Sequence, residues 1–196
     1  MANSCRSKAL DFFMIIGQLK KIKRTGWVYR KVPDPERVAG HMYRMAIMSF
    51  LLEDKTLNRD RCLKLSLVHD MAESIVGDIA PDDGISKEEK YRREKEALDK
   101  LQGLVSEEVG TEIGSLWEEY TNQATPEAKA VKDFDRFDMI LQAHEYEQDE
   151  PERGAYLQEF FDSTQGKFQT PQVVEWTEEL YKRRNNTAEE KSELQS

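Results

Sequence analysis

The sequence has few cysteines and no long apolar segment. Cys5 and Cys62 are the only two cysteines among 196 residues, too few for a disulfide framework or a zinc finger. Cys62 lies in an apolar helical pattern, which favours a buried, reduced thiol. The longest apolar run, residues 45–52, is too short to cross a bilayer, and residues 1–13 lack the features of a cleavable signal peptide. We therefore expect a cytoplasmic or nuclear protein without a membrane partner.

The sequence also lacks an excess of positive charge. Its 29 Lys and Arg residues are outnumbered by 38 Asp and Glu residues, and the formal net charge is −9. Binding to nucleic acid depends on neutralising phosphates with Lys and Arg, so we expect no nucleic-acid partner. Any ligand that carries phosphate should be small and bound locally.

Internal repeats and alternating apolar and polar stretches are absent as well, so the sequence predicts an all-α fold without a sheet. Its length favours a single domain over residues 1–182. Residues 183–196 contain Leu194 as their only large apolar residue and are predicted to be disordered. Helices are expected over 6–22, 34–52, 59–76 and 86–102 and from Pro126 onward, with a loop over 23–36.

Four ionisable residues interrupt the apolar pattern of residues 67–79, LVHDMAESIVGDI. At 100° per residue, His69 and Glu73 share the inward face of the predicted helix, and Asp70 lies about 100° around at its edge. Asp78 follows just past the expected helix end. Carboxylates buried without partners are costly, so this cluster predicts a bound cation.

Matching side chains occur elsewhere in the chain. His41 lies on an apolar stripe of its own predicted helix. In the helix from Pro126, Asp135 faces inward, whereas Asp133 lies about 160° away and is expected to be solvated. Asp138 lies near the inward face and is a weaker candidate for contact with a ligand residue or substrate. Two imidazoles and two carboxylates suit Mn²⁺, Fe²⁺, Co²⁺ or Zn²⁺ with water completing the shell: His41, His69, Asp70 and Asp135.

Each of these signals has a more common structural explanation. A single histidine on an apolar stripe is usually a core residue with its hydrogen bonds made, and a buried acid is usually a helix cap or ion-pair partner. The combination on separate helices favours a metal site, but the pattern by itself does not name a reaction.

The arrangement of His41, His69-Asp70 and Asp135 resembles the H…HD…D motif of the HD-domain superfamily of metal-dependent phosphohydrolases. Longer strings within residues 8–170 are similar to the superfamily's 5′-deoxynucleotidases: RTGWVYRKV, HMYRMAIM, LVHDMAESIVGDIAP, EEKYRRE, VKDFDRFDMILQAHEYE and FFDSTQGKF. The resemblance implies an all-α HD-domain helical bundle, a homodimer, and hydrolysis of deoxyribonucleoside 5′-monophosphates to deoxynucleoside and phosphate.

The resemblance also implies roles for individual residues. A first divalent ion, Mn²⁺, Co²⁺ or Mg²⁺ with Zn²⁺ or Fe²⁺ as alternatives, would be held by His41, His69, Asp70 and Asp135. Glu73 and Asp78 would be catalytic and, in some members, bind a second metal ion together with the carbonyl of Ile79. Relatives often carry an acidic residue immediately before the first histidine, where this chain has Gly40.

A basic and aromatic loop follows the first predicted helix. The guanidinium of Arg24 can grip a phosphate with two hydrogen bonds, and Trp27 can provide a flat wall for a sugar or base. We expect these two residues to bind substrate and to favour deoxyribose by crowding the 2′ position. The neighbouring lysines, including Lys20 and Lys21, are expected to be solvated.

Two other functions fit the sequence. One is a different HD phosphohydrolase that cleaves cyclic or pyrophosphorylated nucleotides. The other is a non-catalytic adapter stabilised by metal, although the presence of both Glu73 and Asp78 favours an enzyme. The apolar residues of 116–123 and 155–168 fit either a dimer interface or the domain's own core.

Overall fold

The computed structural model describes residues 2–150 and 154–194, and the regular elements within these ranges are all helical, as predicted. The α-helices are α1 (Ala2–Ile16), α2 (Thr25–Tyr29), α3 (Val38–Leu51), α4 (Arg59–Val68), α5 (Glu73–Val76), α6 (Lys87–Gln102), α7 (Glu107–Asn122), α8 (Pro126–Asp149), α9 (Gly154–Thr164) and α10 (Pro171–Leu194). The 3₁₀ helices are η1 (Gly17–Lys20) and η2 (Pro81–Asp83).

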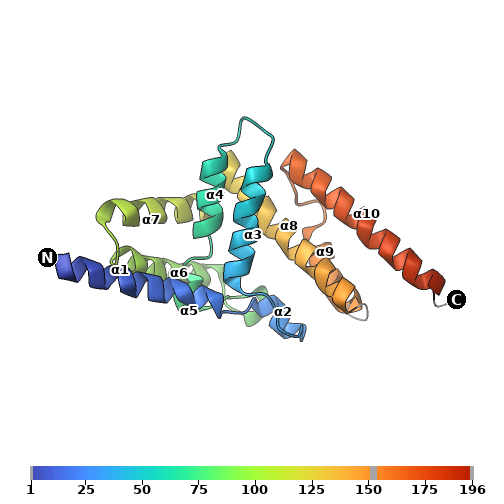
Figure 1. Ribbon diagram of the computed structural model, residues 1–196, viewed down its shortest axis with the longest axis horizontal. Coiled ribbons are helices and arrows are strands. Elements are labelled where there is room, and N and C mark those ends of the chain that lie inside the picture. The colour runs from blue at the N-terminus through green and yellow to red at the C-terminus, as the bar shows by residue number, and fades with distance from the viewer. Residues whose placement is uncertain (1, 151–153, 195–196) are drawn as a thin grey trace.

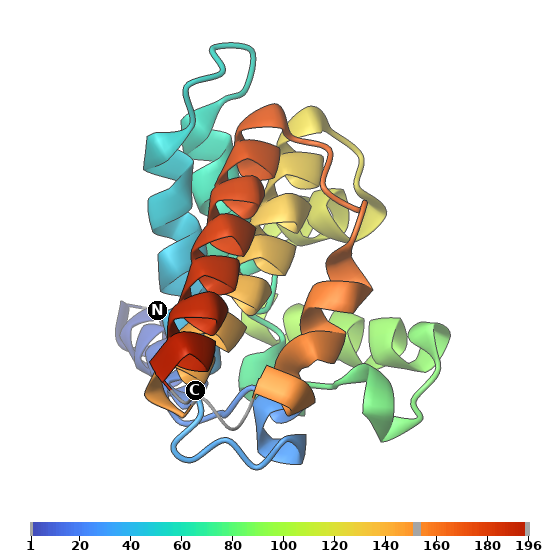
Figure 2. The same cartoon turned by 90° about the vertical axis from the view of Figure 1, so that its right-hand side faces the viewer.

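Helix α8 is the central element of the bundle. It contacts α3, α4, α7, α9 and α10, and α3 also packs closely against α4. Helices α6 and α7 form a pair beside this group, and α10 lies along α8 (Figures 1 and 2). This arrangement brings α3, the end of α4 and the middle of α8 together around one region of the interior.

Large apolar side chains fill the core between these helices. Trp117 and Tyr120 of α7 and Leu157 and Phe161 of α9 are buried in the main core cluster. These residues therefore pack the domain's own core. The sequence had left residues 116–123 and 155–168 as either core or dimer interface. None of the helices in the described ranges is both long and apolar enough to cross a bilayer.

Two predicted helix starts are confirmed by their caps. The Ser86 hydroxyl accepts a hydrogen bond from the Glu89 backbone N–H at 3.2 Å and opens α6. The Thr125 hydroxyl accepts from the Ala128 N–H at 3.1 Å, and Pro126 follows at the first position of α8.

The expected boundaries near residues 23–38 are wrong. Helix α3 begins at Val38 rather than at Asp34, because Asp34 adopts a positive φ of 40° that no helix contains. The predicted loop holds the short helix α2, and the first helix ends at Ile16 before continuing as the tighter helix η1.

The helix predicted over 59–76 is interrupted at the residues of greatest interest. Helix α4 ends at Val68, and the following turns are closed by tighter bonds, such as the Met71 N–H to the Val68 carbonyl at 3.0 Å. Helix α5 then ends at Gly77, as expected, where φ is +79°. His69 and Asp70 consequently lie in a turn between two helices.

Two further expectations need correction. Asp133 is 1% exposed rather than solvated, because it accepts hydrogen bonds from the backbone N–H groups of Gln169 and Thr170 at 2.8 and 2.7 Å. Helical periodicity could not show that the segment before α10 covers this face. Helix α10 also continues to Leu194 through most of the predicted disordered tail, whose Glu and Lys residues favour helix; residues 195–196 lie outside the described ranges. The domain boundary at residue 182 stays a prediction.

Candidate metal centre

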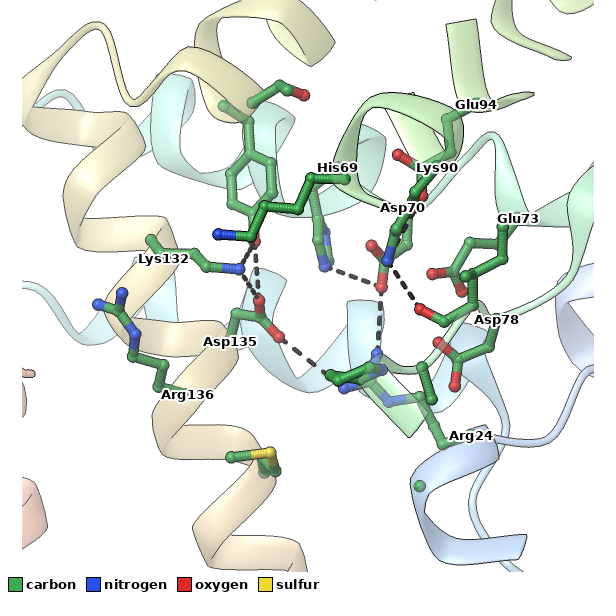
Figure 3. Close-up of a pocket in the computed structure, with 18 of the residues that line it drawn as sticks. Arg24, His69, Asp70, Glu73, Asp78, Lys90, Glu94, Lys132, Asp135 and Arg136 are labelled. Atoms are coloured by element: carbon green, nitrogen blue, oxygen red, sulfur yellow. Dashed lines mark hydrogen bonds and ion pairs between the residues drawn. The ribbon is translucent and has the colours of Figure 1, made fainter. Parts of the chain in front are cut away.

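Four predicted metal ligands come together from three parts of the chain. His41 comes from α3. His69 and Asp70 come from the turn after α4, and Asp135 comes from α8 (Figure 3). Potential ligand atoms of His41, His69 and Asp135 lie within 4.8 Å of one another. Asp70 Oδ2 lies 3.1 Å from His69 Nε2 and 3.8 Å from His41 Nε2. The structure thus brings together the set that the sequence predicted.

Both histidines are held by their Nδ1 atoms. His41 Nδ1 lies 2.6 Å from Asp138 Oδ2, and His69 Nδ1 lies 2.9 Å from the carbonyl oxygen of Ser66. Since both partners accept hydrogen bonds, Nδ1 carries the proton in each neutral ring and Nε2 keeps its lone pair. Both Nε2 atoms are buried and make no hydrogen bond, although carboxylate oxygens lie nearby. Two orphaned imidazole nitrogens beside two carboxylates fit a divalent metal ion.

Asp138 is the carboxylate that contacts His41, whereas Gly40, directly before His41, has no side chain. The sequence indicated Asp138 only as a weaker candidate for contact with a ligand residue or substrate, because its angular position on the helix does not show which side chain it faces. Its carboxylate is fully buried, and its second oxygen accepts a hydrogen bond from Arg44. Arg44 balances this buried charge, and His41 donates a hydrogen bond to it.

Asp135 is oriented by two residues that sequence reasoning missed. Its Oδ2 accepts hydrogen bonds from the Tyr120 hydroxyl and from Lys132 Nζ, each at 2.8 Å. Oδ1 lies 3.3 Å from His41 Nε2. Lys132 could have been found from its position three residues before Asp135 on the same helix, whereas Tyr120 reaches the site from α7.

Local charges keep the two carboxylate ligands ionised. Burial alone would raise the pKa of Asp70, but the nearby His69, Arg24 and His41 outweigh it and lower this pKa. Burial also acts to raise the pKa of Asp135, and Lys132 with the two histidines holds it well below its usual value. Both groups therefore offer the charged oxygens that a metal ion needs.

Glu73 and Asp78 lie close to the ligands but have different surroundings. Glu73 is 2% exposed, and its Oε2 has no hydrogen-bond partner. Burial, followed by the charges of Asp70 and Asp78, raises the pKa of Glu73 well above its usual value. Asp78 Oδ2 instead accepts the Thr25 backbone N–H at 2.5 Å, and the Thr25 hydroxyl donates to the Asp78 carbonyl at 2.6 Å. Asp78 is anchored to α2, whereas one oxygen of Glu73 is unengaged.

The carbonyl of Ile79 has a partner that was not foreseen. It accepts a hydrogen bond from Lys90 Nζ at 2.9 Å, and this ammonium group lies 3.5 Å from Glu94. Burial disfavours the charged ammonium, but Glu94, Glu73 and the nearby aspartates outweigh it and raise the pKa of Lys90. The sequence around Lys90 did not predict this contact, because the contact depends on how α6 packs against α5.

The two predicted substrate residues differ in their accessibility. Arg24 Nη1 lies 3.3 Å from Asp70 Oδ2, and Nη2 lies 3.8 Å from Asp135 Oδ1, so the guanidinium adjoins the ligand set. Trp27 is 2% exposed; its Nε1 donates to Glu36 at 2.8 Å and its ring centroid lies 4.4 Å from that of Phe160. Arg24 borders the open space, whereas Trp27 is packed into its wall.

A cavity of about 700 Å³ opens beside these residues. This volume is in the range that accommodates small ligands. Aromatic side chains line it at Tyr91, Trp117 and Phe160, and basic side chains at Lys87, Lys132, Arg136 and Lys167. The cavity therefore combines positive groups with flat apolar surfaces in a protein whose net charge is −9.

Residues 16–174 match the HD-domain family, and the chain belongs to this family. It is 53% identical to the 5′-deoxynucleotidase HDDC2 of Xenopus laevis over 192 residues, covering 96% of this chain and 95% of the relative. The human protein of the same name is 55% identical over 171 residues, covering 87% of this chain and 83% of the relative. A conserved hypothetical protein from Pyrococcus furiosus has a similar solved structure, with a TM-score of 0.72, 32% identity, and coverage of 88% of this chain and 99% of that one.

Proposed function

We propose that this protein is a metal-dependent 5′-deoxynucleotidase that hydrolyses deoxyribonucleoside 5′-monophosphates to deoxynucleoside and phosphate. The observation that carries the proposal is the pair of buried histidines, each held at Nδ1 and each presenting an unengaged Nε2 toward carboxylates. The high identity to relatives named 5′-deoxynucleotidase supports the substrate class.

The proposed first metal site consists of one imidazole nitrogen from each histidine and two carboxylates: His41, His69, Asp70 and Asp135. Mixed nitrogen and oxygen donors suit Mn²⁺ or Co²⁺, with Zn²⁺ or Fe²⁺ as alternatives, and the family resemblance adds Mg²⁺. When bound, such an ion offsets the charge of a phosphate and lowers the pKa of water. Arg44 and Asp138 would keep His41 in the required tautomer.

We assign Glu73 the role of accepting a proton from the attacking water. Its Oε2 is free of hydrogen bonds, and its raised pKa brings its proton affinity closer to that needed near neutral pH. Asp78 is a catalytic candidate whose backbone and side chain also fix the start of α2. Since Arg24 directly precedes Thr25 at the start of α2, Asp78 would help to position it.

Arg24 would bind the phosphate of the substrate. A guanidinium can donate two parallel hydrogen bonds to phosphate oxygens, and that of Arg24 already lies beside Asp70 and Asp135. The sugar and base would extend into the cavity, where Phe160 covers the ring of Trp27. Trp27 would then shape the 2′ pocket from behind Phe160 rather than by stacking on the substrate.

Phosphate release from a panel of nucleotides tests this proposal. Metal-stripped protein would be supplied with Mn²⁺, Co²⁺, Mg²⁺ or Zn²⁺ and given deoxy- and ribonucleoside 5′-monophosphates. We expect metal-dependent release that favours the deoxy substrates and is lost in His69→Ala. His144→Ala is the matched control, since it changes the third histidine, which is not among the proposed ligands, and should retain activity.

The same panel separates the other functions. Cleavage only of cyclic or pyrophosphorylated nucleotides would identify a different HD phosphohydrolase. A folded, metal-loaded protein that releases nothing would be a metal-stabilised adapter. Either result would contradict the deoxynucleotidase proposal.

We also propose a homodimer formed through one face of α3. Tyr43, Ile47, Phe50 and Leu51 recur on this face, and Tyr43 and Phe50 remain 67% and 62% exposed. Burial of these side chains against a second copy would remove them from water. Light scattering after gel filtration should show a dimer, and Phe50→Glu should give a monomer that retains its helical circular dichroism.

A cytoplasmic or nuclear location is proposed for the same protein. Cys62 is a buried free thiol, in keeping with a reducing compartment. Microscopy of the tagged full-length chain would test this placement, and a signal confined to the secretory pathway would contradict it.

A further inference from the structure

Lys132 and Arg24 approach different oxygens of the same carboxylate. Lys132 Nζ donates to Asp135 Oδ2 at 2.8 Å, whereas Arg24 Nη2 lies 3.8 Å from Asp135 Oδ1 (Figure 3). Both cations line the cavity, and the Lys132 side chain is 36% exposed. Since a single carboxylate separates them, a group the size of a phosphate can contact both.

The ammonium group of Lys132 has a hydrogen bond to offer. Besides Asp135 it donates to the Tyr120 hydroxyl oxygen at 3.1 Å. Among the described residues these contacts use two of its three N–H donors, so the third can serve a ligand in the cavity.

The charges of the proposed site call for a second cation beside Arg24. A phosphate monoester carries nearly two negative charges near neutral pH. The charges of Asp70 and Asp135 equal that of a divalent ion, so the proposed first metal site adds no net positive charge. Arg24 supplies one positive charge, and Lys132 supplies another next to the same carboxylate. Because an unbalanced charge in a partly buried site is costly, a bound phosphate favours contact with both.

We infer that Lys132 is a second phosphate-binding residue, which holds the phosphate of the substrate together with Arg24. The inference rests on the proposed function and adds a residue to the same site. Lys132 then has two roles: its contact with Asp135 orients a metal ligand, and its remaining donor contacts a phosphate oxygen.

Calorimetric titration of the full-length protein, saturated with Mn²⁺, tests the second role with two ligands. One is thymidine, and the other is its non-hydrolysable 5′-phosphonate, in which carbon replaces the bridging oxygen. The difference between their affinities reports the phosphate contacts alone. We expect Lys132→Met to weaken binding of the phosphonate at least about tenfold, as loss of a hydrogen bond between charged groups does, and to leave binding of thymidine unchanged. Lys132→Arg keeps the charge and should retain most of the affinity for the phosphonate.

Tyr120→Phe is the matched control for the orienting role. It removes the other hydrogen bond to Asp135 Oδ2, which is also 2.8 Å long, without removing a charge. Lys129→Met removes the charge of an exposed lysine three residues earlier in α8. Both variants should bind the phosphonate about as tightly as the wild type.

Equal losses of phosphonate affinity in Lys132→Met and Tyr120→Phe would show that Lys132 only orients Asp135, and would overturn the inference. Unchanged phosphonate affinity in Lys132→Met would overturn it as well. Lys132→Gln supplies the same comparison if circular dichroism shows that the Met variant is unfolded.

Phosphonate binding and phosphate release fail separately. Release by the wild type, with phosphonate binding that does not depend on Lys132, would overturn this inference alone. Phosphonate binding that depends on Lys132, without release from any monophosphate, would support the inference and count against the proposed activity. A wild-type protein that binds the phosphonate no more tightly than thymidine would overturn both.

Discussion

Asp138 lies 2.6 Å from Nδ1 of His41, and both side chains are completely shielded from solvent. Burial acts to raise the pKa of Asp138, but His41 and Arg44 outweigh it and lower this pKa, so the carboxylate is ionised. An ionised carboxylate has no proton to donate, so Nδ1 of His41 must be the donor. His41 therefore presents Nε2 to the remaining ligands. A residue 97 positions away in the sequence thus decides which nitrogen of His41 is available.

Replacing Asp138 with asparagine should weaken metal binding about 10- to 100-fold, as loss of such supporting contacts typically does. An amide can donate to Nδ1 and so favour the wrong tautomer. Calorimetric titration with Mn²⁺ measures the effect. Asp133→Asn is the matched control on the same helix: it should lower the unfolding temperature, because Asp133 anchors the backbone of Gln169 and Thr170, but leave metal affinity unchanged. Equal losses of affinity would contradict the assignment.

Removing the metal should destabilise the folded protein. An ion present at 100 times its dissociation constant stabilises the native state by about 2.7 kcal/mol, which is about 5–10 °C for a chain of this size. Thermal unfolding with Mn²⁺ and after chelation measures this difference. His69→Ala should show almost no shift on adding Mn²⁺, and a full shift in that variant would rule out the proposed ligand set.

Glu73→Gln should reduce kcat by about 10²- to 10⁴-fold, the usual contribution of a proton acceptor in the reaction. The neutral amide keeps the size of the side chain but cannot take a proton from water. Elemental analysis should still find one tightly bound ion per chain, which separates this effect from loss of metal. A Gln variant with normal kcat would show that Glu73 is not the acceptor.

Arg24→Ala should raise KM for deoxyribonucleoside monophosphates about tenfold or more, since a hydrogen bond to a charged group contributes about 1.5–3 kcal/mol. Steady-state kinetics of phosphate release measure this change in KM. Lys20→Glu and Lys21→Glu are suitable controls because both lysines are exposed and precede α2. The same rise in KM in all three variants would indicate a general electrostatic effect and not a phosphate contact.

Trp27→Ala should lower the free energy of unfolding by about 3–5 kcal/mol, as expected for a large buried aromatic side chain. Denaturant titration would measure the loss. Val28→Ala, one residue further along α2, changes an exposed side chain and should cost far less. Stability unchanged in Trp27→Ala would contradict its place in the core.

Helical periodicity predicted the inward faces that carry His41, His69 and Glu73, because the period of a helix is a local property of the sequence. The ionisable groups on these faces predicted a shared metal site, and the family resemblance supported the same set and named the reaction. All three residues are buried, and the ring centroids of His41 and His69 lie 5.4 Å apart.

The failures of prediction arise where distant segments meet. Asp133 was predicted to be solvated because the sequence of α8 does not show that the backbone N–H groups of Gln169 and Thr170 pack against it. Tyr120 and Lys90 reach the site from α7 and α6 through packing that no single helix specifies. The turn at Asp70 was taken for continuous helix, since its tighter hydrogen bonds leave no mark in the apolar pattern.

The distance along the chain between the parts of the site also bears on how the protein is made. A chain is synthesised from its amino terminus, so His41 and His69 emerge well before the carboxylates of α8 exist. The growing polypeptide holds two imidazoles without Asp135 to complete the set or Asp138 to fix the tautomer. The complete ligand set therefore exists only after synthesis has passed α8, so an ion held by all four side chains would join a chain in which most of the bundle has already been made.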